Sequence, residues 1–365
     1  MTPTRPLLEV SDLHVHFRAG TGFFSSSKST IAAVDGISLS IMPGETFGLV
    51  GESGCGKTSF GRAVLRLGEV TSGRIVFDGA DITAMAPGEL RRTRRRMQMI
   101  FQDPYASLDP RMTVHEIVAE PIRTHDLAKG NAIQPMVAEL LRLVGLDPRR
   151  SGQYPHAFSG GQRQRIGIAR ALAVRPDFLV CDEATSALDV SIRAQVLNLL
   201  ADLRRRYGLS FLFISHDLGV VRHMSDRIGV MYLGKLVEVG PVSAVFERSL
   251  HPYTHALLSA VPLPDPALER TRRRIILKGD LPNPAKPPDG CRFHSRCWLW
   301  ETLGRPNRCR TEPPTLADLG AGHLAACHFT KEAEAARPQA ASTIRPPARR
   351  IRQRDPGRFT MARRS

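Results

Sequence analysis

The chain has 365 residues, a formal net charge of +16 and six cysteines. This length is enough for two to three domains with a substantial buried core. No stretch reaches the run of about 18 to 20 apolar residues that a membrane-spanning helix needs. The first residues lack the charged and apolar regions of a secretory signal peptide, so we expect a cytosolic protein without a disulfide framework.

The first segment with recognisable chemistry is FGLVGESGCGKTS, residues 47–59. Its apolar start predicts a buried strand, and the residues after Lys57 predict a helix that follows a glycine-rich loop. Glycines let such a loop turn its N–H groups towards phosphate oxygens, while Lys57 can reach the β- and γ-phosphates and the Thr58 hydroxyl can bind Mg²⁺. The expected nucleotide-binding residues are Gly51, Glu52, Ser53, Gly54, Cys55, Gly56, Lys57, Thr58 and Ser59.

The segment FSGGQRQR, residues 158–165, is too polar for a core and precedes an apolar helical pattern. Free N–H groups, a serine hydroxyl and the helix dipole at such a helix N-terminus form an anion site. A chain that has its own phosphate loop does not need a second such element for the same nucleotide. The sequence therefore predicts that the nucleotide held by a second subunit is bound by Ser159, Gly160, Gly161 and Gln162.

Two further predicted strands end in polar residues. The apolar run 178–181 is followed by Asp182 and Glu183, and the run 209–214 precedes His216. At the end of a buried parallel strand, Asp182 can hold the Mg²⁺ hydration shell and Glu183 can polarise the attacking water as a general base. His216 can donate a hydrogen bond to the γ-phosphate. The alternatives are that the two acids cap a helix and that the histidine is structural.

Four cysteines lie between residues 291 and 327, with gaps of five, eleven and seventeen residues between them. In a Pro-rich segment too small to build much core, this density predicts a structural metal site. Zinc sites usually contain cysteine pairs about two to four residues apart, whereas wider gaps suit a [4Fe–4S] cluster. We favour iron–sulfur over zinc, and thiols that only pack are the third possibility. The candidate ligands are Cys291, Cys297, Cys309 and Cys327.

The positive charge is unevenly distributed along the chain. From Arg337 onward there are nine arginines and one acid, Asp355, in a segment that we expect to be a disordered, solvated tail. Acidic lipid headgroups or nucleic acid are the alternative partners of this tail. The run RRTRRR, residues 91–96, is expected to be a solvated helix face, with attraction to phosphate or acidic lipid as the alternative. No specific nucleic-acid partner is predicted.

These motifs resemble those of the ATP-binding subunits of ABC transporters, over about residues 7–330. Residues 51–58 resemble Walker A, residues 158–162 the signature and residues 178–182 Walker B, although Phe158 stands where leucine is common. The resemblance implies ATP and Mg²⁺ as ligands. It also implies a Q-loop at Gln102, the catalytic glutamate at Glu183, a D-loop that includes Asp189 and the switch histidine at His216.

The resemblance also assigns contacts to the metal and to the base of the nucleotide. Mg²⁺ is expected to be held through Thr58, Gln102 and Asp182. In this family an aromatic residue near the first strand stacks on adenine. Phe17 is the first choice, and Phe23 and Phe24 in the insertion after it are the alternatives.

The segment HPYTHALLSAVPLPDP, residues 251–266, and the cysteines after it resemble the C-terminal extension of the ATPases of dipeptide, oligopeptide and nickel importers. The segments FQDPYASLDP and CDEATSALDVSIRAQVLNLL are more similar to the second of their two paired ATPases. This implies ATP hydrolysis that powers the import of peptides or related solutes, and it points to iron–sulfur at the cysteines. The gap between Cys297 and Cys309 is wider than in the family. A soluble ABC ATPase of translation or DNA repair and an exporter ATPase are the alternatives.

The resemblance implies an α/β fold of the P-loop ABC ATPase type, with a RecA-like parallel sheet and a helical signature subdomain. Residues 1–95 and 172–250 are expected to form the mostly parallel sheet and its flanking helices. We expect a cassette at residues 1–250 that includes a helical subdomain at about 96–171, a cysteine-containing module at 251–330 and a basic tail at 331–365. The implied partners are a paired ATPase subunit (identical or different), two permease subunits and an extracytoplasmic solute-binding protein. The implied location is the cytoplasmic face of the membrane, through the permease.

Overall fold

The structure is a computed structural model that describes residues 5–19, 29–262, 270 and 274–336. Its strands are β1 (Leu8–Ala19), β2 (Ser29–Ile41), β3 (Thr46–Val50), β4 (Ser72–Phe77), β5 (Ala80–Asp81), β6 (Met97–Ile100), β7 (Phe178–Asp182), β8 (Ser210–Ile214), β9 (Arg227–Tyr232), β10 (Lys235–Pro241), β11 (Ala317–Asp318) and β12 (Leu324–Ala325). Its helices are α1 (Lys57–Val64), α2 (Pro87–Arg94), α3 (Val114–Thr124), α4 (Ile133–Leu143), α5 (Gly160–Leu172), α6 (Val190–Tyr207), α7 (Leu218–Met224), α8 (Val242–Glu247), α9 (Pro252–Ala260), α11 (Trp298–Thr302), α12 (Arg308–Thr311) and α13 (Thr330–Ala335). Short 3-10 helices lie at Gly130–Ala132, Pro148–Arg150, Pro155–Ala157 and His294–Arg296.

An eight-stranded sheet forms the centre of the molecule, with strand order β11-β12-β10-β9-β3-β8-β7-β6. The strands β6, β7, β8, β3 and β9 run parallel to one another, and β10 pairs antiparallel with β9. Every residue of β3, β7 and β8 is buried, which explains why these segments are unbroken apolar runs in the sequence. The prediction of an α/β fold with a parallel sheet is confirmed.

A second sheet, which the sequence prediction missed, has the order β2-β1-β4-β5 and is antiparallel throughout. Residues 1–95 therefore do not all belong to the mostly parallel sheet that we expected. In β1, Leu8 and Val10 are buried, whereas Glu9 is partly exposed and Ser11 is exposed. This alternation is typical of a sheet that faces solvent on one side. This pattern distinguishes β1 from the fully buried parallel strands.

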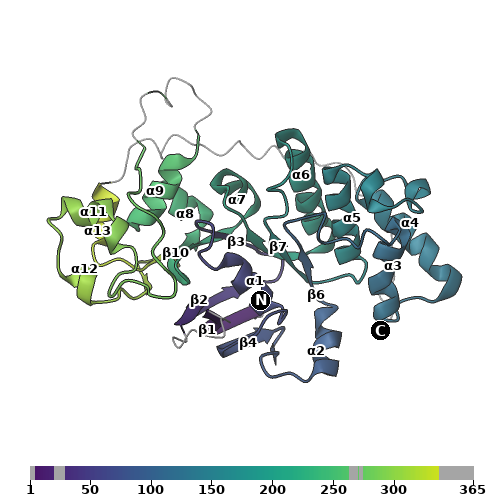
Figure 1. The fold of residues 1–365 in the computed structure, drawn as a ribbon, viewed down its shortest axis with the longest axis horizontal. Helices are drawn as coiled ribbons and strands as arrows, with labels where there is room; N and C mark the ends of the chain where they lie inside the picture. Colours follow the sequence, from purple (N-terminus) through teal and green to yellow (C-terminus); the bar gives the residue numbers. More distant parts are fainter. Residues whose placement is uncertain (1–4, 20–28, 263–269, 271–273, 337–365) are drawn as a thin grey trace, which may run out of the picture.

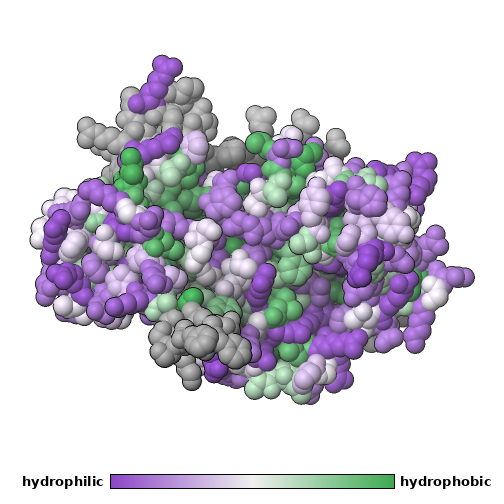
Figure 2. All heavy atoms as spheres, in the orientation of Figure 1, coloured by the Kyte–Doolittle hydropathy of each residue, from purple (hydrophilic) through white to green (hydrophobic). Residues whose placement is uncertain are grey.

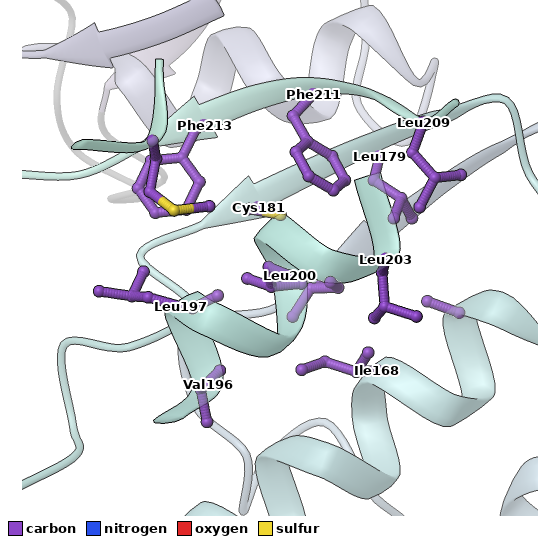
Figure 3. Packing of buried hydrophobic residues seen from close by; sticks show 14 of the residues in the cluster. Ile168, Leu179, Cys181, Val196, Leu197, Leu200, Leu203, Leu209, Phe211 and Phe213 are labelled. Atoms are coloured by element: carbon purple, nitrogen blue, oxygen red, sulfur yellow. The ribbon is translucent and has the colours of Figure 1, made fainter. Parts of the chain in front are cut away.

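The core lies on both faces of the parallel sheet, because successive side chains of a strand point to opposite faces. In β8, Phe211 and Phe213 belong to one apolar cluster, and Leu212 and Ile214 belong to the other. Figure 3 shows the first cluster, where Leu200 and its neighbours on α6 pack against β7 and β8. Burying each such side chain contributes about 1.5–3 kcal/mol, so this packing fixes the strand ends that carry the polar residues.

The helical part of the cassette consists mainly of α3, α4 and α5, which pack against one another at one end of the molecule (Figure 1). The predicted helical subdomain began at about residue 96, but Met97–Ile100 forms β6, which pairs with β7 in the main sheet. Three of the four residues in the run MQMI are buried. The segment forms its backbone hydrogen bonds with β7 and is the edge strand of the sheet. The first helix of this part, α3, begins with a capping box between Thr113 and Glu116.

The C-terminal part, with α11, α12 and α13, lies at the end of the molecule opposite α3 and α4 (Figure 1). It is attached to the main sheet through β12, which pairs with β10 at Glu238 and Ala325. Helix α13 covers the expected start of the basic tail at residue 331. The rest of that tail, from residue 337, and the alternative adenine contacts Phe23 and Phe24 lie outside the described residues.

Part of the arginine run 91–96 is bound within the fold, contrary to the expectation of a solvated helix face. Arg94 Nε donates to the carbonyl oxygen of Leu65 at 3.1 Å. Arg96 pairs with Asp177 at 2.6 Å and with Asp78 at 2.9 Å. Two arginines of this run, Arg94 and Arg96, therefore make contacts within the fold.

The surface offers no large apolar band on the face drawn in Figure 2, where hydrophilic residues prevail and hydrophobic ones are scattered among them. Within the part of the chain that the structure describes, no helix combines the length and the apolar character needed to cross a bilayer.

Candidate nucleotide-binding and catalytic site

The glycine-rich loop connects β3 to α1 as predicted. Gly56 has φ 107°, and a Cβ there would overlap the carbonyl oxygen of Ala33, so only glycine fits. A Cβ at Gly51 would likewise overlap the carbonyl oxygen of Met231. No side chain caps the N-terminus of α1, so its first N–H groups are available to phosphate oxygens.

Lys57 is buried at the start of α1, and its ammonium group bridges the loop. Its Nζ donates to the carbonyl oxygens of Gly51 at 2.8 Å and of Glu52 at 2.9 Å. The side chain therefore lies across the concave side of the loop, where it can exchange these bonds for phosphate oxygens.

Asp182 at the end of β7 contacts the loop directly. The Thr58 hydroxyl donates to Asp182 Oδ1 at 3.0 Å. Burial raises the pKa of the Asp182 carboxyl above its usual value, and the hydrogen bond from Thr58 offsets only part of this effect. A hydroxyl and a carboxylate side by side are oxygen ligands of the kind that Mg²⁺ prefers, so these two residues fit a magnesium ion next to the phosphates.

Glu183 lies between two polar side chains from the neighbouring strands. Its Oε2 atom is 3.2 Å from Gln102 Nε2 and 3.1 Å from His216 Nδ1. Gln102, Glu183 and His216 follow β6, β7 and β8, which are adjacent and parallel, so their carboxyl ends meet at one edge of the sheet. Glu183 itself has φ 44°, a left-handed conformation that is uncommon outside glycine. The fold thus brings together three residues that are far apart in the sequence.

The FSGGQ segment forms the start of α5. Ser159 caps the helix by accepting from Gln162 N at 3.3 Å, and Gln162 Oε1 accepts from Ser159 N at 3.1 Å. Gly161 faces α6, where a Cβ would overlap Ile192. Helix α5 packs against α3, α4, α6 and β6, so this N-terminus belongs to the helical part of the cassette.

Asp189 occupies the N-cap position of α6 without a side-chain cap bond. The sequence reasoning missed Arg193 on that helix, which donates to the carbonyl oxygen of Leu188 at 3.2 Å and to Asp217 at 3.4 Å. Arg193 thereby links the turn after β7 to the turn after β8. An isolated arginine on a helix gives no sequence signal for such a bridge.

Phe17, the expected adenine contact, lies on β1 opposite Ile31 of β2, and this residue is 48% exposed. An exposed aromatic face at this position can stack on a base.

The four C-terminal cysteines surround one small cavity, together with Phe293, Leu299, Trp300 and other residues. All six cysteines of the chain are free thiols. Burial raises the pKa of Cys291 to about 11 and the pKa values of Cys297 and Cys327 to about 12, and the pKa of Cys309 is also raised. Backbone N–H groups of Trp300 and Phe329 point at the sulfur atoms of Cys297 and Cys327, each at 3.4 Å. The segments predicted to share a metal site do converge.

A phosphate loop between β3 and α1, acidic residues at the end of β7 and a helical part that carries FSGGQ define an ATP-binding cassette. The profile described as ABC transporter matches residues 34–186. The profile described as oligopeptide/dipeptide transporter, C-terminal region, matches residues 237–302.

Relatives match almost the full chain. The oligopeptide transport ATP-binding protein OppF of Salmonella typhimurium is 51% identical over 310 residues, which cover 84% of this chain and 92% of OppF. The oligopeptide transport ATP-binding protein AppF of Bacillus subtilis is 48% identical over 324 residues, which cover 88% and 97%. The chain therefore belongs to the ABC transporter ATP-binding proteins, in the family that has the oligopeptide/dipeptide transporter C-terminal region.

Solved structures agree with this assignment. A dimeric, post-hydrolysis structure of the ATP-binding cassette MJ0796 with ADP and Pi has a TM-score of 0.58 and 26% identity, and covers 64% of this chain and 98% of its own. The protein is an ATPase, and its family implies a dimeric ATPase with membrane permease partners.

Proposed function

We propose that this ATPase powers the import of peptides or related solutes through a separate membrane permease. The observation that carries the proposal is the C-terminal region, residues 237–302, which matches the region of oligopeptide and dipeptide transporters. The relatives named for oligopeptide transport support the same solute class. The proposed assembly has a paired ATPase subunit, two permease subunits and an extracytoplasmic solute-binding protein. The chain then lies at the cytoplasmic face of the membrane, bound to the permease.

Fractionation of cells and analysis of the purified complex test this function. An importer subunit sediments with the membrane through its permease, whereas an ATPase of translation follows the ribosomes. Mass spectrometry of the solute that copurifies with the intact complex is expected to identify a peptide or a related solute. An exporter-type permease in that complex would contradict import.

The site residues have roles that follow from their positions. The loop residues 51–59 place the phosphates of ATP, and Lys57 neutralises charge on the β- and γ-phosphates. Bound Mg²⁺ neutralises the charge that develops on the phosphate oxygens, and Thr58, Asp182 and Gln102 would hold it. Glu183 accepts a proton from water as the water oxygen bonds to the γ-phosphorus and the bond to the β,γ-bridging oxygen breaks, which releases ADP.

His216 and the signature complete the site in this proposal. The imidazole of His216 can donate to the γ-phosphate while it orients Glu183. Ser159, Gly160, Gly161 and Gln162 would bind the ATP of the partner cassette, because a single chain already has its own phosphate loop. Two ATP molecules would thus lie between the two cassettes, and Asp189 would lie near the same interface.

Gln102 is proposed to couple the nucleotide site to the helical part of the cassette. It contacts Glu183 and opens the segment that leads from β6 to α3. Gln102→Ala is expected to lower transport by about 5- to 100-fold and to weaken ATP binding much less, because the link between the sites is lost while the contacts of the phosphate loop remain. Transport into proteoliposomes and nucleotide titration measure the two effects.

Gln98→Ala is the matched control for this prediction. Gln98 lies on β6, four residues before Gln102, and its side chain donates to the carbonyl oxygen of Arg94 at 2.8 Å instead of to Glu183. Transport by the Gln98 variant should equal that of the unmodified protein. Unchanged transport in the Gln102 variant would reject the coupling role.

The domain division proposed for the chain is a cassette at residues 1–250, a cysteine-containing module at 251–330 and a basic tail from 331. The convergence of residues from 251 to 329 on the cysteine cavity supports the second unit.

We also propose that the four cysteines hold a [4Fe–4S] cluster with a structural role. All four are in the described part of the chain, and no three of their sulfur atoms lie within 4.8 Å of one another. Four thiolates on one zinc ion would be about 3.8 Å apart, given Zn–S bonds of about 2.3 Å. A cluster binds each thiolate to a different iron, so it fits more widely spaced sulfurs, and the two N–H groups aimed at sulfur fit thiolate ligands.

Anaerobically purified protein is expected to be brown and to contain about four irons and four sulfides per chain. Cys297→Ser should bleach the colour, because it removes one ligand of the proposed cluster. Cys55→Ser is the matched control, since Cys55 is buried in the phosphate loop and should leave the iron content unchanged. Colourless protein with one zinc would support zinc instead, and metal-free protein would support simple packing of the thiols.

A further inference from the structure

Glu52, the second residue of the phosphate loop, is held by residues from outside the loop. Its N–H donates to the hydroxyl oxygen of Tyr253 on α9 at 2.9 Å. Its carboxylate receives two bonds from the Arg296 guanidinium, at 2.8 Å to Oε2 and 3.3 Å to Oε1. Its carbonyl oxygen accepts from Lys57. Every polar group of Glu52 is therefore engaged, and its two partners from outside the loop and α1, Tyr253 and Arg296, come from the C-terminal part of the chain.

These contacts lie in a largely buried environment. The Tyr253 side chain is fully buried, and the Arg296 side chain is only 9% exposed. The rings of Tyr232, Tyr253 and Phe293 pack together, with centroids 4.7 to 5.3 Å apart. A two-pronged guanidinium–carboxylate pair in such surroundings is stronger and geometrically better defined than a solvated surface pair.

A second arginine of the same segment is linked to the loop through the β9–β10 turn. Arg292 contacts Asp35 and the carbonyl oxygen of Leu233. The next residue, Gly234, donates to the carbonyl oxygen of Cys55 at 2.9 Å. The segment 292–296 therefore reaches the phosphate loop both at Glu52 and, through the β9–β10 turn, at Cys55.

We propose that Arg296 and Tyr253 are positioning residues that hold the phosphate loop in its ATP-binding conformation. The N–H of Glu52 donates to Tyr253, and its carboxylate is bound by Arg296. The first residues of the loop are therefore held in place by residues that do not belong to the loop. The N–H groups that follow, up to the start of α1, are then aimed at the phosphates before ATP arrives. Preorganisation of this kind raises affinity because binding no longer has to order the loop. The C-terminal part of the chain thus contributes to the nucleotide site.

The test is the steady-state ATPase activity of the assembled complex, together with the Kd for a fluorescent ATP analogue. Arg296→Met keeps the length of the side chain and removes its charge, and it is expected to raise KM and Kd for ATP by about 5- to 10-fold with kcat changed by less than about twofold. Arg296→Lys should recover part of the affinity, since one charged bond to Glu52 remains possible. Arg308→Met is the matched control, because Arg308 forms an exposed pair with Glu312 in the same part of the chain.

Glu52→Gln removes the same ion pair from the loop side without altering the C-terminal part, so it tests the proposal even if Arg296→Met does not fold. It should raise KM by a similar factor, and the double variant should be no worse than either single one. A lower kcat at unchanged KM in both variants, with full effect also in Arg296→Lys, would show that Arg296 only stabilises the fold. Additive effects in the double variant would overturn the proposed link through Glu52.

Discussion

Glu183→Gln is expected to reduce ATP turnover by about 10²- to 10⁴-fold while ATP binding is retained, because only the carboxylate can accept the proton of the attacking water. Glutamine keeps the size of the side chain and an oxygen that can accept from Gln102 and His216, which lie 3.2 and 3.1 Å from Glu183. The phosphate loop is untouched. With ATP bound but not cleaved, the two cassettes should remain closed on each other, so size-exclusion chromatography with ATP and Mg²⁺ should show a stable dimer.

Lys57→Ala is the contrasting variant for this experiment. Loss of the lysine side chain should weaken nucleotide binding itself, because its ammonium group lies across the loop that holds the phosphates. Glu301→Gln, at a partly exposed glutamate on α11, is the control for a neutral Glu-to-Gln change. Full turnover of a complex in which both cassettes carry the glutamate change would contradict the role of Glu183 as the base.

Glu238→Ala is expected to lower the free energy of unfolding of the C-terminal part by about 3 kcal/mol, because buried donors lose their acceptor. Glu238 is fully buried on β10, and its carboxylate accepts from Leu250 N at 2.7 Å, from His251 N at 3.1 Å and from His323 Nε2 at 2.8 Å. It therefore fastens the start of α9 and the approach to β12 to the main sheet. Urea unfolding followed by tryptophan fluorescence measures the effect, since both tryptophans, Trp298 and Trp300, lie in this part of the chain.

Glu312→Ala is the matched control, because Glu312 forms an exposed pair with Arg308 and should contribute less than about 0.5 kcal/mol. Glu238→Gln should fall between the two, since its amide oxygen can keep one or two of the three bonds. An unfolding midpoint of Glu238→Ala equal to that of Glu312→Ala would show that the buried carboxylate does not hold the module to the sheet.

The parts of the site that the sequence predicted are contiguous segments with strict local requirements. Gly56 must be glycine for its backbone angle, Lys57 and Thr58 must follow at the start of a helix, and Asp182 must end a buried strand. Such requirements leave a readable pattern within about ten residues. The fold class followed because the motifs of an ABC cassette occur in their usual order. The prediction failed where no motif marks the segment and only the apolar pattern is available, as for β6 and for the antiparallel sheet of β1, β2, β4 and β5.

The sequence by itself determined the phosphate loop, the acidic strand end and the cysteine-rich segment, because neighbouring residues carry each of these signals. Only the tertiary structure decided which distant residues hold the phosphate loop in place. Glu52 is 201 residues from Tyr253 and 244 residues from Arg296 in the chain, yet it contacts both of them. Tyrosine and arginine occur widely for many reasons, so neither type marks its partner in the sequence. The strand order of the main sheet and the pairing of β12 with β10 bring these segments together, and packing across such distances is not encoded in local periodicity.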